Sequence, residues 1–272
     1  MPEVIEVNFL KDEIASTFIG KKVVEAILNN EKISNVCKNE FEKELKDEVL
    51  KDVARHGKVL ILKFSNYKYL LIHFLLTGYL RLIDDSEKEK AQAYLKFDNG
   101  KSIGIFGIMS NGFIHLHETK NINNLDEIKE LGIDVLDEKF TLENFKKIIL
   151  KNGTKRIKDI LLDQSIIAGL GNAYSDEILF VSKVNPKRKG GYLSEDEIES
   201  IYKNIFFVLE KSKKYGGASE LSFVHLDGSK GHFHEHFLVH KREGEKCPIC
   251  GTPIETTKIG GRTSYFCPKC QR

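Results

Sequence analysis

Cys247-Pro248-Ile249-Cys250 and Cys267-Pro268-Lys269-Cys270 are two C-x-x-C pairs near the carboxyl end of the 272-residue chain. Thiolates from two such pairs can close a tetrahedral site, and zinc suits it because the ion accepts soft ligands and imposes no geometry of its own. Residues 252–266 alternate weakly and carry Gly260-Gly261 at their middle, which predicts a β-hairpin that turns at the glycines. The stretch therefore predicts a zinc ribbon with one structural Zn²⁺, bound by Cys247, Cys250, Cys267 and Cys270.

The alternative for these cysteines is a pair of disulfides. The only other cysteine is Cys37, and the acidic start Met1-Pro2-Glu3-Val4-Ile5-Glu6 predicts no secretory leader, so a reducing, cytoplasmic compartment is expected. That compartment favours zinc. A zinc ribbon by itself is compatible with DNA binding, RNA binding or a purely structural role, so the function must be sought elsewhere in the chain.

The length and composition indicate a protein of two domains. At 272 residues the chain can bury a substantial core, and its 41% hydrophobic and 30% charged residues are those of an ordinary globular protein. No apolar run approaches the eighteen or so residues that a membrane span needs. Residues 151–272 carry a net charge of +5 and residues 1–150 one of −3, so the second half is the better candidate for binding phosphates.

The first 116 residues predict a β-sandwich that follows one helix. The pattern predicts a helix over residues 2–17, with Pro2 in its first turn and Val4, Val7, Leu10 and Ile14 on one face. Short β-type runs then alternate with turn residues. These runs are residues 22–28, 59–64, 69–74, 79–83, 91–97 and 102–106.

The rest of the chain predicts a linker over residues 117–140, a helical domain over 141–236 and a zinc-binding hairpin over 237–272. Helices are expected at 142–151, 155–163 and 172–181, and Ser194 with Glu197 forms a capping box before a longer helix that ends at Gly216-Gly217. Residues 217–231 read as a mobile loop and 233–239 as a strand. The predicted fold class is therefore α+β, with several domains.

The amino end carries a possible nucleophile. If an aminopeptidase removes Met1, Pro2 becomes a secondary amine, and an α-amino group has a pKa of about 7.7–8.0. Such an amine can attack an aldehyde-level carbon and form an iminium, while the neighbouring Glu3 moves protons. The plainer interpretation is that Pro2 and Glu3 simply favour the start of a helix.

Several motifs occur in one order along nearly the whole chain. They are Met1-Pro2-Glu3 with Glu6, Gly57-Lys58, Leu161-Leu162-Asp163-Gln164, Gly169-Leu170-Gly171-Asn172-Ala173-Tyr174-Ser175-Asp176-Glu177, and Gly261-Arg262 in the zinc hairpin. Together they resemble the formamidopyrimidine-DNA glycosylase / endonuclease VIII family of bacterial base-excision enzymes. The resemblance implies an N-terminal β-sandwich, a helix-two-turns-helix domain and a C-terminal β-hairpin zinc finger.

The resemblance also implies an activity and a partner. The expected enzyme is a DNA glycosylase and AP lyase for oxidised purines, acting as a monomer on double-stranded DNA with damaged bases or abasic sites, in the bacterial cytoplasm at the nucleoid. Pro2 is the implied Schiff-base nucleophile and Glu3 the proton donor. Lys58 and Arg262 are the implied proton donors for β- and δ-elimination, and Glu6 has a supporting role.

Further residues are implied to contact DNA: His73, Phe106, Lys155, Asn172 and Arg262. Lys155, Arg156 and Lys158 are expected to form a nonspecific edge that binds the DNA backbone. Each has a plainer alternative. The alternative role of Asn172 is helix capping alone, and that of His73 is a core residue. Lys58 and Arg262 could be solvated turn residues.

The chain departs from the family pattern at three places. Ile5 stands where many relatives have proline, and Leu76 aligns with the family's void-filling methionine. Ser102-Ile103-Gly104-Ile105-Phe106-Gly107 aligns with a stretch whose arginine reads the opposite base. Phe106 is then expected to remain a wedge, while the arginine is missing.

Other functions stay open on the sequence alone. An endonuclease VIII-like enzyme would act on oxidised pyrimidines, a catalytically silent zinc-ribbon protein would only bind damaged DNA, and a third alternative is an RNA-binding factor. His232, His234 and His236 would face one way on a strand, which makes a second metal site conceivable there.

Overall fold

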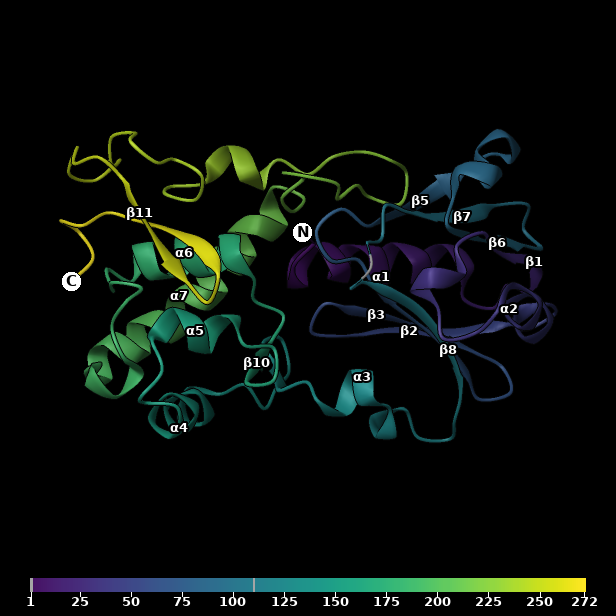
Figure 1. The fold of residues 1–272 in the computed structure, drawn as a ribbon, viewed down its shortest axis with the longest axis horizontal. Coiled ribbons are helices and arrows are strands. Elements are labelled where there is room, and N and C mark those ends of the chain that lie inside the picture. The colour runs from purple at the N-terminus through teal and green to yellow at the C-terminus, as the bar shows by residue number, and fades with distance from the viewer. Residues whose placement is uncertain (1, 110) are drawn as a thin grey trace. The chain divides into compact units, whose positions relative to one another are not determined.

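The chain forms two compact units, which are both discontinuous in sequence (Figure 1). The structure is a computed structural model that describes residues 2–109 and 111–272. The first unit consists of Met1–Lys129 and Tyr215–His234, and the second of Glu130–Lys214 and Glu235–Arg272. Residues 215–234, which follow the longest helix, therefore belong to the first unit and not to the helical part of the chain.

The first unit is a sandwich of two antiparallel four-stranded sheets. One sheet has the order β1-β6-β7-β5 and the other β2-β3-β4-β8. The strands are β1 (Val23–Leu28), β2 (Leu50–His56), β3 (Val59–Phe64), β4 (Lys68–His73), β5 (Tyr79–Ile83), β6 (Ala93–Phe97), β7 (Ser102–Phe106) and β8 (Phe113–Glu118). The predicted β-sandwich is confirmed, and all six predicted strands are present within two residues of their expected bounds.

The strands β2 and β8 and the helix α2 (Lys38–Leu45) of the first unit were not predicted. Only Leu50 and Val53 of β2 are buried, and only Phe41 and Leu45 of α2. The other residues of β2 and α2 are mostly charged, so these two elements show too few apolar residues for their periodicity to be detected. The short elements of this unit are η1 (Glu31–Ile33), η2 (Asp85–Lys90), η3 (Ile122–Asn124) and α3 (Asp126–Lys129).

The core of the first unit is built around α1 (Val4–Phe18), which lies between the two sheets in Figure 1. Its residues Val7, Leu10 and Ile14 are at most 1% exposed and pack in one cluster with side chains from both sheets, as the predicted apolar face requires. Phe223 and Leu226 from the returning segment complete this cluster. The loop of residues 217–231 is therefore anchored in the core of the unit.

The start of α1 differs from the prediction. The helix begins at Val4 with Glu3 as its N-cap, so Pro2 precedes the first turn instead of lying within it. The backbone N–H of Glu3 donates to the Glu6 carboxylate at 2.8 Å, which is one half of a capping box. Glu3 and Glu6 therefore define where the helix begins.

The second unit is mainly helical. Its helices are α4 (Leu142–Lys151), α5 (Ile157–Leu162), α6 (Asn172–Val181) and α7 (Glu195–Lys214), joined by the short parallel pair β9 (Ile133–Asp134) and β10 (Ile167–Ala168) and by η4 (Gly190–Tyr192). The predicted caps are confirmed: Thr141 Oγ1 accepts from Asn144 N–H, the Glu197 carboxylate accepts from Ser194 N–H, and Ser194 Oγ accepts from Glu197 N–H. Ile198, Ile201, Ile205 and Val208 of α7 are buried as predicted.

The second unit ends in the predicted hairpin. Strands β11 (Glu255–Ile259) and β12 (Arg262–Phe266) pair antiparallel, with Ile259 opposite Arg262. Gly260 and Gly261 have φ angles of +54° and +74°, which a two-residue hairpin turn of this kind requires. The turn position and the location of Arg262 directly after it are thus confirmed.

The strand predicted over residues 233–239 is wrong. Phe233–His236 forms a 3₁₀ helix, η5. Phe233 and Phe237 are the buried aromatics of this stretch, but Glu235 between them is exposed, whereas all three would share one face of a strand. His232, His234 and His236 consequently do not project from one face of a strand.

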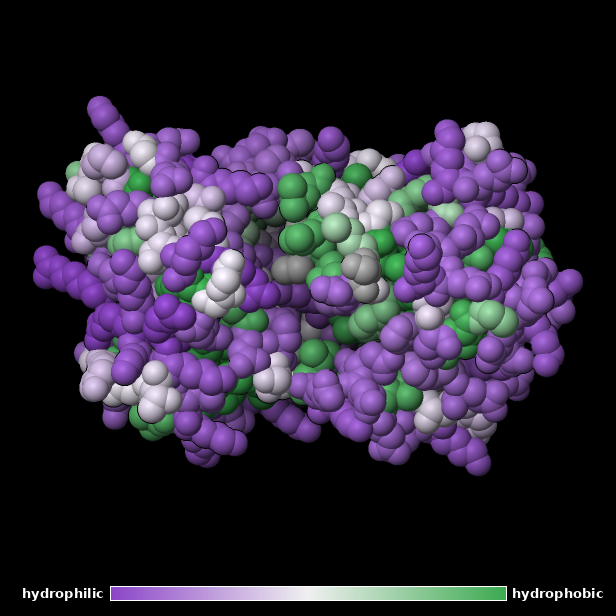
Figure 2. Space-filling model, viewed as in Figure 1, coloured by the Kyte–Doolittle hydropathy of each residue, from purple (hydrophilic) through white to green (hydrophobic). Residues whose placement is uncertain are grey.

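The outer surface is mostly hydrophilic in the view of Figure 2, with hydrophobic side chains gathered on the part that carries the first unit. Within residues 2–109 and 111–272, no helix has the length and apolarity that crossing a membrane would require.

Candidate active site and zinc centre

The amino end of the first unit contains two buried carboxylates. Glu3 is 4% exposed and Glu6 1% exposed, and Pro2 before them is buried as well. Glu6 accepts hydrogen bonds from the backbone N–H groups of Glu3, at 2.8 Å, and of Ala218, at 2.7 Å. A buried carboxylate is tolerated when donors compensate for the lost water, and these bonds provide that compensation.

Gly217 allows the returning chain to approach Glu6. Its φ is +81°, and a Cβ at this position would lie 3.0 Å from the Glu6 Oε1 and 3.2 Å from the Phe223 ring. Both the backbone conformation and the close contact favour glycine. The loop of residues 217–231 therefore begins against the carboxylate that also caps α1.

Lys58 lies in the tight turn between β2 and β3. His56 pairs with Val59, so Gly57-Lys58 is a two-residue turn, and Gly57 has a φ of +56°. Lys58 is only 6% exposed, so its alternative interpretation as an exposed turn lysine is wrong. Figure 1 shows this hairpin end and the start of α1 toward the same side of the unit.

His73, the last residue of β4, pairs with Val59 next to Lys58. Burial and the positive charge of Lys58 lower the pKa of His73 to about 4. The imidazole is therefore neutral near pH 7 and can offer one N–H as a donor without adding charge. A half-buried neutral histidine beside a buried lysine suits a contact with an anionic oxygen.

Three loops next to one another in the first unit expose apolar side chains. Leu76 is 53% exposed, Met109 54% and Leu221 55%. Hydrogen bonds connect their loops: Thr77 Oγ1 donates to Gly107 O at 2.6 Å, and Ser222 Oγ donates to Leu76 O at 3.2 Å. Exposed side chains of this size, on loops fixed by such contacts, are available to a partner molecule.

Phe106 is not among these exposed side chains. It is 7% exposed, and its ring stacks on Tyr79 at a centroid distance of 5.0 Å with the Arg81 guanidinium 5.4 Å from its centre. Strand β7 (Ser102–Phe106) is buried along its whole length, so Phe106 is not exposed as the expected wedge would be. Of the described residues that follow β7, Gly107, Met109 and Asn111 are exposed, while Ile108 is buried.

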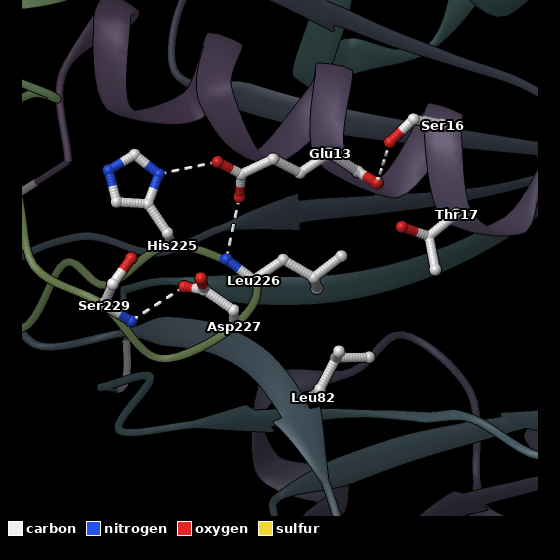
Figure 3. A pocket seen from close by; sticks show the side chains of 8 residues that line it. All are labelled: Glu13, Ser16, Thr17, Leu82, His225, Leu226, Asp227 and Ser229. Atoms are coloured by element: carbon white, nitrogen blue, oxygen red, sulfur yellow. Dashed lines mark hydrogen bonds and ion pairs between the residues drawn. The ribbon is translucent and has the colours of Figure 1, made fainter.

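The cavity drawn in Figure 3 lies at the other half of α1 and is lined by Glu13, Ser16, Thr17, Leu82, His225, Leu226, Asp227 and Ser229. The Glu13 carboxylate accepts from Leu226 N–H at 2.7 Å and lies 2.6 Å from His225 Nδ1. This ion pair raises the pKa of His225 despite partial burial. Because Glu13 is ten residues beyond Glu3 in the helix, about 15 Å along its axis, this cavity is separate from the amino-terminal carboxylates.

In the second unit, Asn172 and Arg262 are neighbours. Asn172 is the first residue of α6, and its Nδ2 donates to the backbone oxygen of Thr263 at 2.9 Å. Arg262, at the start of β12, is exposed and lines a cavity with Lys155, Asp159, Leu162 and Asp163. The hairpin tip is therefore fixed to the positive end of α6, where a helix favours anions.

The predicted basic edge is only partly present. Lys155 is exposed, with its ammonium 3.0 Å from the Asp163 carboxylate, and Arg156 pairs with Asp159 at 2.6 Å. Lys158 is fully buried and forms an ion pair with Asp176, so its assignment to a DNA-binding edge is wrong. Its place in a helix whose Ile157, Ile160 and Leu161 are also buried explains the error, because the three basic residues look alike in sequence.

Asp176 organises a buried polar network. Besides Lys158, it accepts from Ser264 Oγ at 2.9 Å and Tyr265 N–H at 3.1 Å, and it lies 2.7 Å from His240 Nδ1. The adjacent Glu177 accepts from three consecutive backbone N–H groups, those of Leu238, Val239 and His240. Two neighbouring carboxylates of α6 therefore hold both the zinc hairpin and the segment that precedes it.

The four predicted cysteines form one cluster. The Sγ atoms of Cys247, Cys250, Cys267 and Cys270 all lie within 4.8 Å of one another. Backbone N–H groups of Ile249 and Cys270 approach the Cys247 and Cys267 sulfurs at 3.5 and 3.4 Å, as in knuckles that bind metal. Four cysteine sulfurs this close together fit one structural zinc ion.

Comparisons with known proteins agree with this geometry. The model of the formamidopyrimidine-DNA glycosylase N-terminal domain matches residues 1–107, and that of the H2TH domain of the same enzyme matches residues 131–223. A zinc finger found in FPG and IleRS matches residues 244–272. A protein from Pelotomaculum thermopropionicum named formamidopyrimidine-DNA glycosylase is 35% identical over 276 residues, covering 100% of this chain and 99% of its own. The chain belongs to the formamidopyrimidine-DNA glycosylase family.

Other members of the formamidopyrimidine-DNA glycosylase family are similar over the same length. The Listeria monocytogenes protein of that name is 31% identical and covers 100% of both chains. A Lactococcus lactis variant in complex with DNA containing Fapy-dG has a TM-score of 0.90 and 30% identity over 100% of both chains. The Lactococcus lactis protein with DNA containing an abasic site has a TM-score of 0.90 and 28% identity over 99% of both. The predicted family and fold are thus confirmed.

Sequence reasoning missed several residues that shape this family member. Glu13 with His225 and Glu6 with Ala218 are pairs 212 residues apart, so no local signal could have connected them. Asp176 and Glu177 were noticed only as part of a motif. His115, His117 and Glu127 were also missed, although His-x-His in an alternating run is a detectable signal of two imidazoles on one face.

Proposed function

We propose that this chain is a base-excision-repair DNA glycosylase and AP lyase that removes oxidised purines, 8-oxoguanine and formamidopyrimidines, from double-stranded DNA. The observation that carries this proposal is the pair of buried carboxylates, Glu3 and Glu6, directly after Pro2, in a chain of the formamidopyrimidine-DNA glycosylase family. Buried carboxylates are costly unless hydrogen bonds compensate for the lost water, and such groups gather at functional sites.

The chemistry begins at the Pro2 nitrogen once Met1 has been removed. The unprotonated secondary amine attacks C1′ of the damaged nucleotide, and the glycosidic bond breaks as the base leaves with a proton. Opening of the sugar ring gives an iminium between Pro2 and C1′. Loss of a C2′ proton then expels the 3′ phosphate by β-elimination, and a second elimination expels the 5′ phosphate. Hydrolysis of the iminium restores the amine.

The first unit supplies the groups that move protons. Glu3 is the proton donor, and Glu6 positions it by accepting the Glu3 backbone N–H. Lys58 is assigned to β-elimination, where a buried ammonium stabilises the negative charge that develops on the departing phosphate. His73, neutral because its pKa is lowered to about 4, donates a hydrogen bond to a phosphate oxygen.

The second unit binds the DNA backbone. Arg262 contacts phosphates flanking the lesion and assists δ-elimination, and Lys155 adds a nonspecific backbone contact. Asn172 acts through the hairpin, because its amide already donates to Thr263 O. The zinc ion on Cys247, Cys250, Cys267 and Cys270 stabilises the hairpin that carries Arg262. Leu76 occupies the space that the flipped nucleotide leaves.

The decisive test is covalent trapping. The natively processed protein, with its N-terminal mass measured first, is incubated with abasic duplex and sodium borohydride. We expect one protein–DNA adduct per active chain, whose digestion places the link on Pro2, and little or none with Pro2→Gly. A processed protein that binds the duplex but gives no adduct would reduce the function to damaged-DNA binding.

Substrate choice is tested by single-turnover excision. We expect faster release of 8-oxoguanine than of thymine glycol from otherwise identical duplexes, and the reverse order would indicate an endonuclease VIII-like enzyme. Residues 107–112 of the sequence contain no arginine, so we expect weak discrimination among bases opposite the lesion. We also infer that the protein works in the bacterial cytoplasm at the nucleoid, where its DNA substrate is.

A further inference from the structure

A cluster of two histidines and one glutamate lies in the first unit, on segments to which the proposed function assigns nothing. His115 Nδ1 is 2.5 Å and His117 Nε2 3.0 Å from the same oxygen of Glu127. One ligand atom from each of the three residues lies within 4.8 Å of the other two. Within the described parts of the chain, the only other group of this kind is the cluster of four cysteines.

The two histidines are held on one face of β8. Ile114 and Leu116 of this strand are buried in the core, so the alternating His115 and His117 project from the opposite face. The strand is fixed by its ladder to β4, with Leu71 opposite His115. The Phe113 ring stacks on His115 at 4.5 Å, which restrains the imidazole. Both nitrogen donors therefore sit on a rigid sheet.

The carboxylate comes from another segment. Glu127 lies in α3, nine residues beyond the end of β8, and the chain between them folds back so that its carboxylate reaches both imidazoles. The side chains of His115, His117 and Glu127 are 27%, 21% and 15% exposed. The three donors are thus sheltered from bulk water and still open to an entering ion.

We propose that His115, His117 and Glu127 form a second metal site, which binds one divalent first-row transition metal, with Zn²⁺ as the expected ion. Zinc accepts a donor set of two imidazole nitrogens and one carboxylate oxygen. Mg²⁺ and Ca²⁺ prefer ligands that are all oxygen, so this set does not suit them. Zinc–ligand bonds of about 2.1 Å place tetrahedral donors about 3.4 Å apart, so Glu127 would need to withdraw by less than about 1 Å. The remaining coordination position is left for water.

The site would fasten the chain where it leaves the first unit. The first segment of that unit ends at Lys129, the last residue of α3. Metal bound to Glu127 would join α3 to β8 and close a short loop over residues 119–126. Closing a loop with a metal stabilises the folded state by reducing the freedom of the unfolded chain. The proposed site is structural and independent of the glycosylase reaction.

The competing explanation is a hydrogen-bonded clasp without metal, since Glu127 can accept from both imidazoles. The test uses the full-length protein with its cysteine site filled, verified as one zinc per chain by native mass spectrometry. Zn²⁺ is then titrated calorimetrically. We expect the wild-type protein to bind a second equivalent of Zn²⁺. In His117→Ala and in Glu127→Gln, the affinity for this second equivalent should fall at least tenfold. The control His232→Ala, at an exposed histidine just before η5, leaves the binding of the second equivalent unchanged.

A second measurement needs no variant. Modification of His115 and His117 by diethylpyrocarbonate is followed by peptide mass with and without added Zn²⁺. We expect protection of both histidines, together with slower amide hydrogen exchange over residues 119–128. A stoichiometry that stays at one zinc per chain, or equal modification in both conditions, would overturn the proposal and leave only the clasp.

Discussion

The Glu6 carboxylate accepts a hydrogen bond at 2.7 Å from the backbone N–H of Ala218, a residue 212 positions further along the chain. The same carboxylate accepts from Glu3 N–H. One side chain therefore connects the proposed proton donor with the first residues of the loop 217–231. A substitution that removes the Glu6 carboxylate is therefore expected to alter the conformation of both the amino end and this loop.

We predict that Glu6→Gln loosens the loop and slows excision. The amide retains only one acceptor oxygen for two N–H donors, and a hydrogen bond to a charged group is worth about 1.5–3 kcal/mol. We expect about a tenfold or larger fall in the single-turnover excision rate. Amide exchange at Ala218 should accelerate in parallel. The exposed Glu89→Gln serves as the control. Unchanged exchange at Ala218 in Glu6→Gln would show that the bond does not hold the loop.

The contact between His225 and Glu13 predicts a pH dependence. Hydrogen bonding to Glu13 raises the pKa of His225, so the protonated histidine is favoured in the folded state. Its stabilising contribution is fully present below the unfolded pKa of about 6.5 and is lost as the pH rises through the raised value. The nearby Asp227, whose pKa is lowered chiefly by hydrogen bonds from Ser229, stays ionised throughout.

The measurement is amide exchange over residues 225–229, corrected for the intrinsic effect of pH. We expect protection in the wild type to decrease above about pH 6.5, and a flat profile in Glu13→Gln. If the variant keeps the wild-type slope, the titrating group is not the His225–Glu13 pair.

Substitutions of Lys158 and Lys155 are expected to affect different properties, stability and DNA binding, although the two residues are only three positions apart. Lys158→Met leaves the buried Asp176 without its ammonium partner, and we expect a loss of about 3–5 kcal/mol in the free energy of unfolding. Lys155→Met removes an exposed charge and should change stability by less than about 0.5 kcal/mol. It should instead lower the slope of log affinity for undamaged duplex against log salt by about 1. A stable Lys158→Met protein with a reduced salt slope would contradict the buried position.

Zinc removal is predicted to weaken DNA binding before it affects the first unit. Cys267 is buried in a small core with Phe180, Val239 and Ile254, so Cys267→Ser removes a ligand from the centre of that core. We expect loss of the zinc ion and a large drop in duplex affinity, measured by metal analysis and fluorescence anisotropy. The free cysteine Cys37, exposed and far along the chain from the cluster, gives the matched control Cys37→Ser. Full affinity in the zinc-free variant would show that the hairpin does not carry the DNA contact.

Much of the fold was predictable because its signals are local. A few neighbouring residues are enough to indicate the conformation in each of these cases: the C-x-x-C pairs, the Gly260-Gly261 turn, the Ser194 capping box and the alternating runs. The zinc ligands followed from the same local spacing. Pro2 and Glu3 were identified only through the order of motifs along the chain, because two residues cannot by themselves distinguish catalysis from helix capping.

The failures have one physical origin, which is that burial is a property of the folded chain. Lys158 reads as basic surface, but Asp176 and Ser264 from distant segments compensate for its charge. Phe106 reads as an exposed wedge, but Tyr79 and Arg81 cover its ring. The alternation of histidine and phenylalanine after residue 231 suggested a strand, whereas Phe233–His236 folds into a 3₁₀ helix that exposes Glu235 between the buried Phe233 and Phe237.

The first unit takes its last segment, Tyr215–His234, from beyond the helices of the second. On the ribosome, its core side chains Phe223 and Leu226 emerge on the order of ten seconds after Lys129 at typical rates of translation. Until then the nascent sandwich has an unfilled place in its interior and an unanchored Glu6 and Glu13. A chain truncated after the N-terminal β-sandwich strands should therefore aggregate, whereas one supplied with residues 215–234 through a short artificial linker should fold.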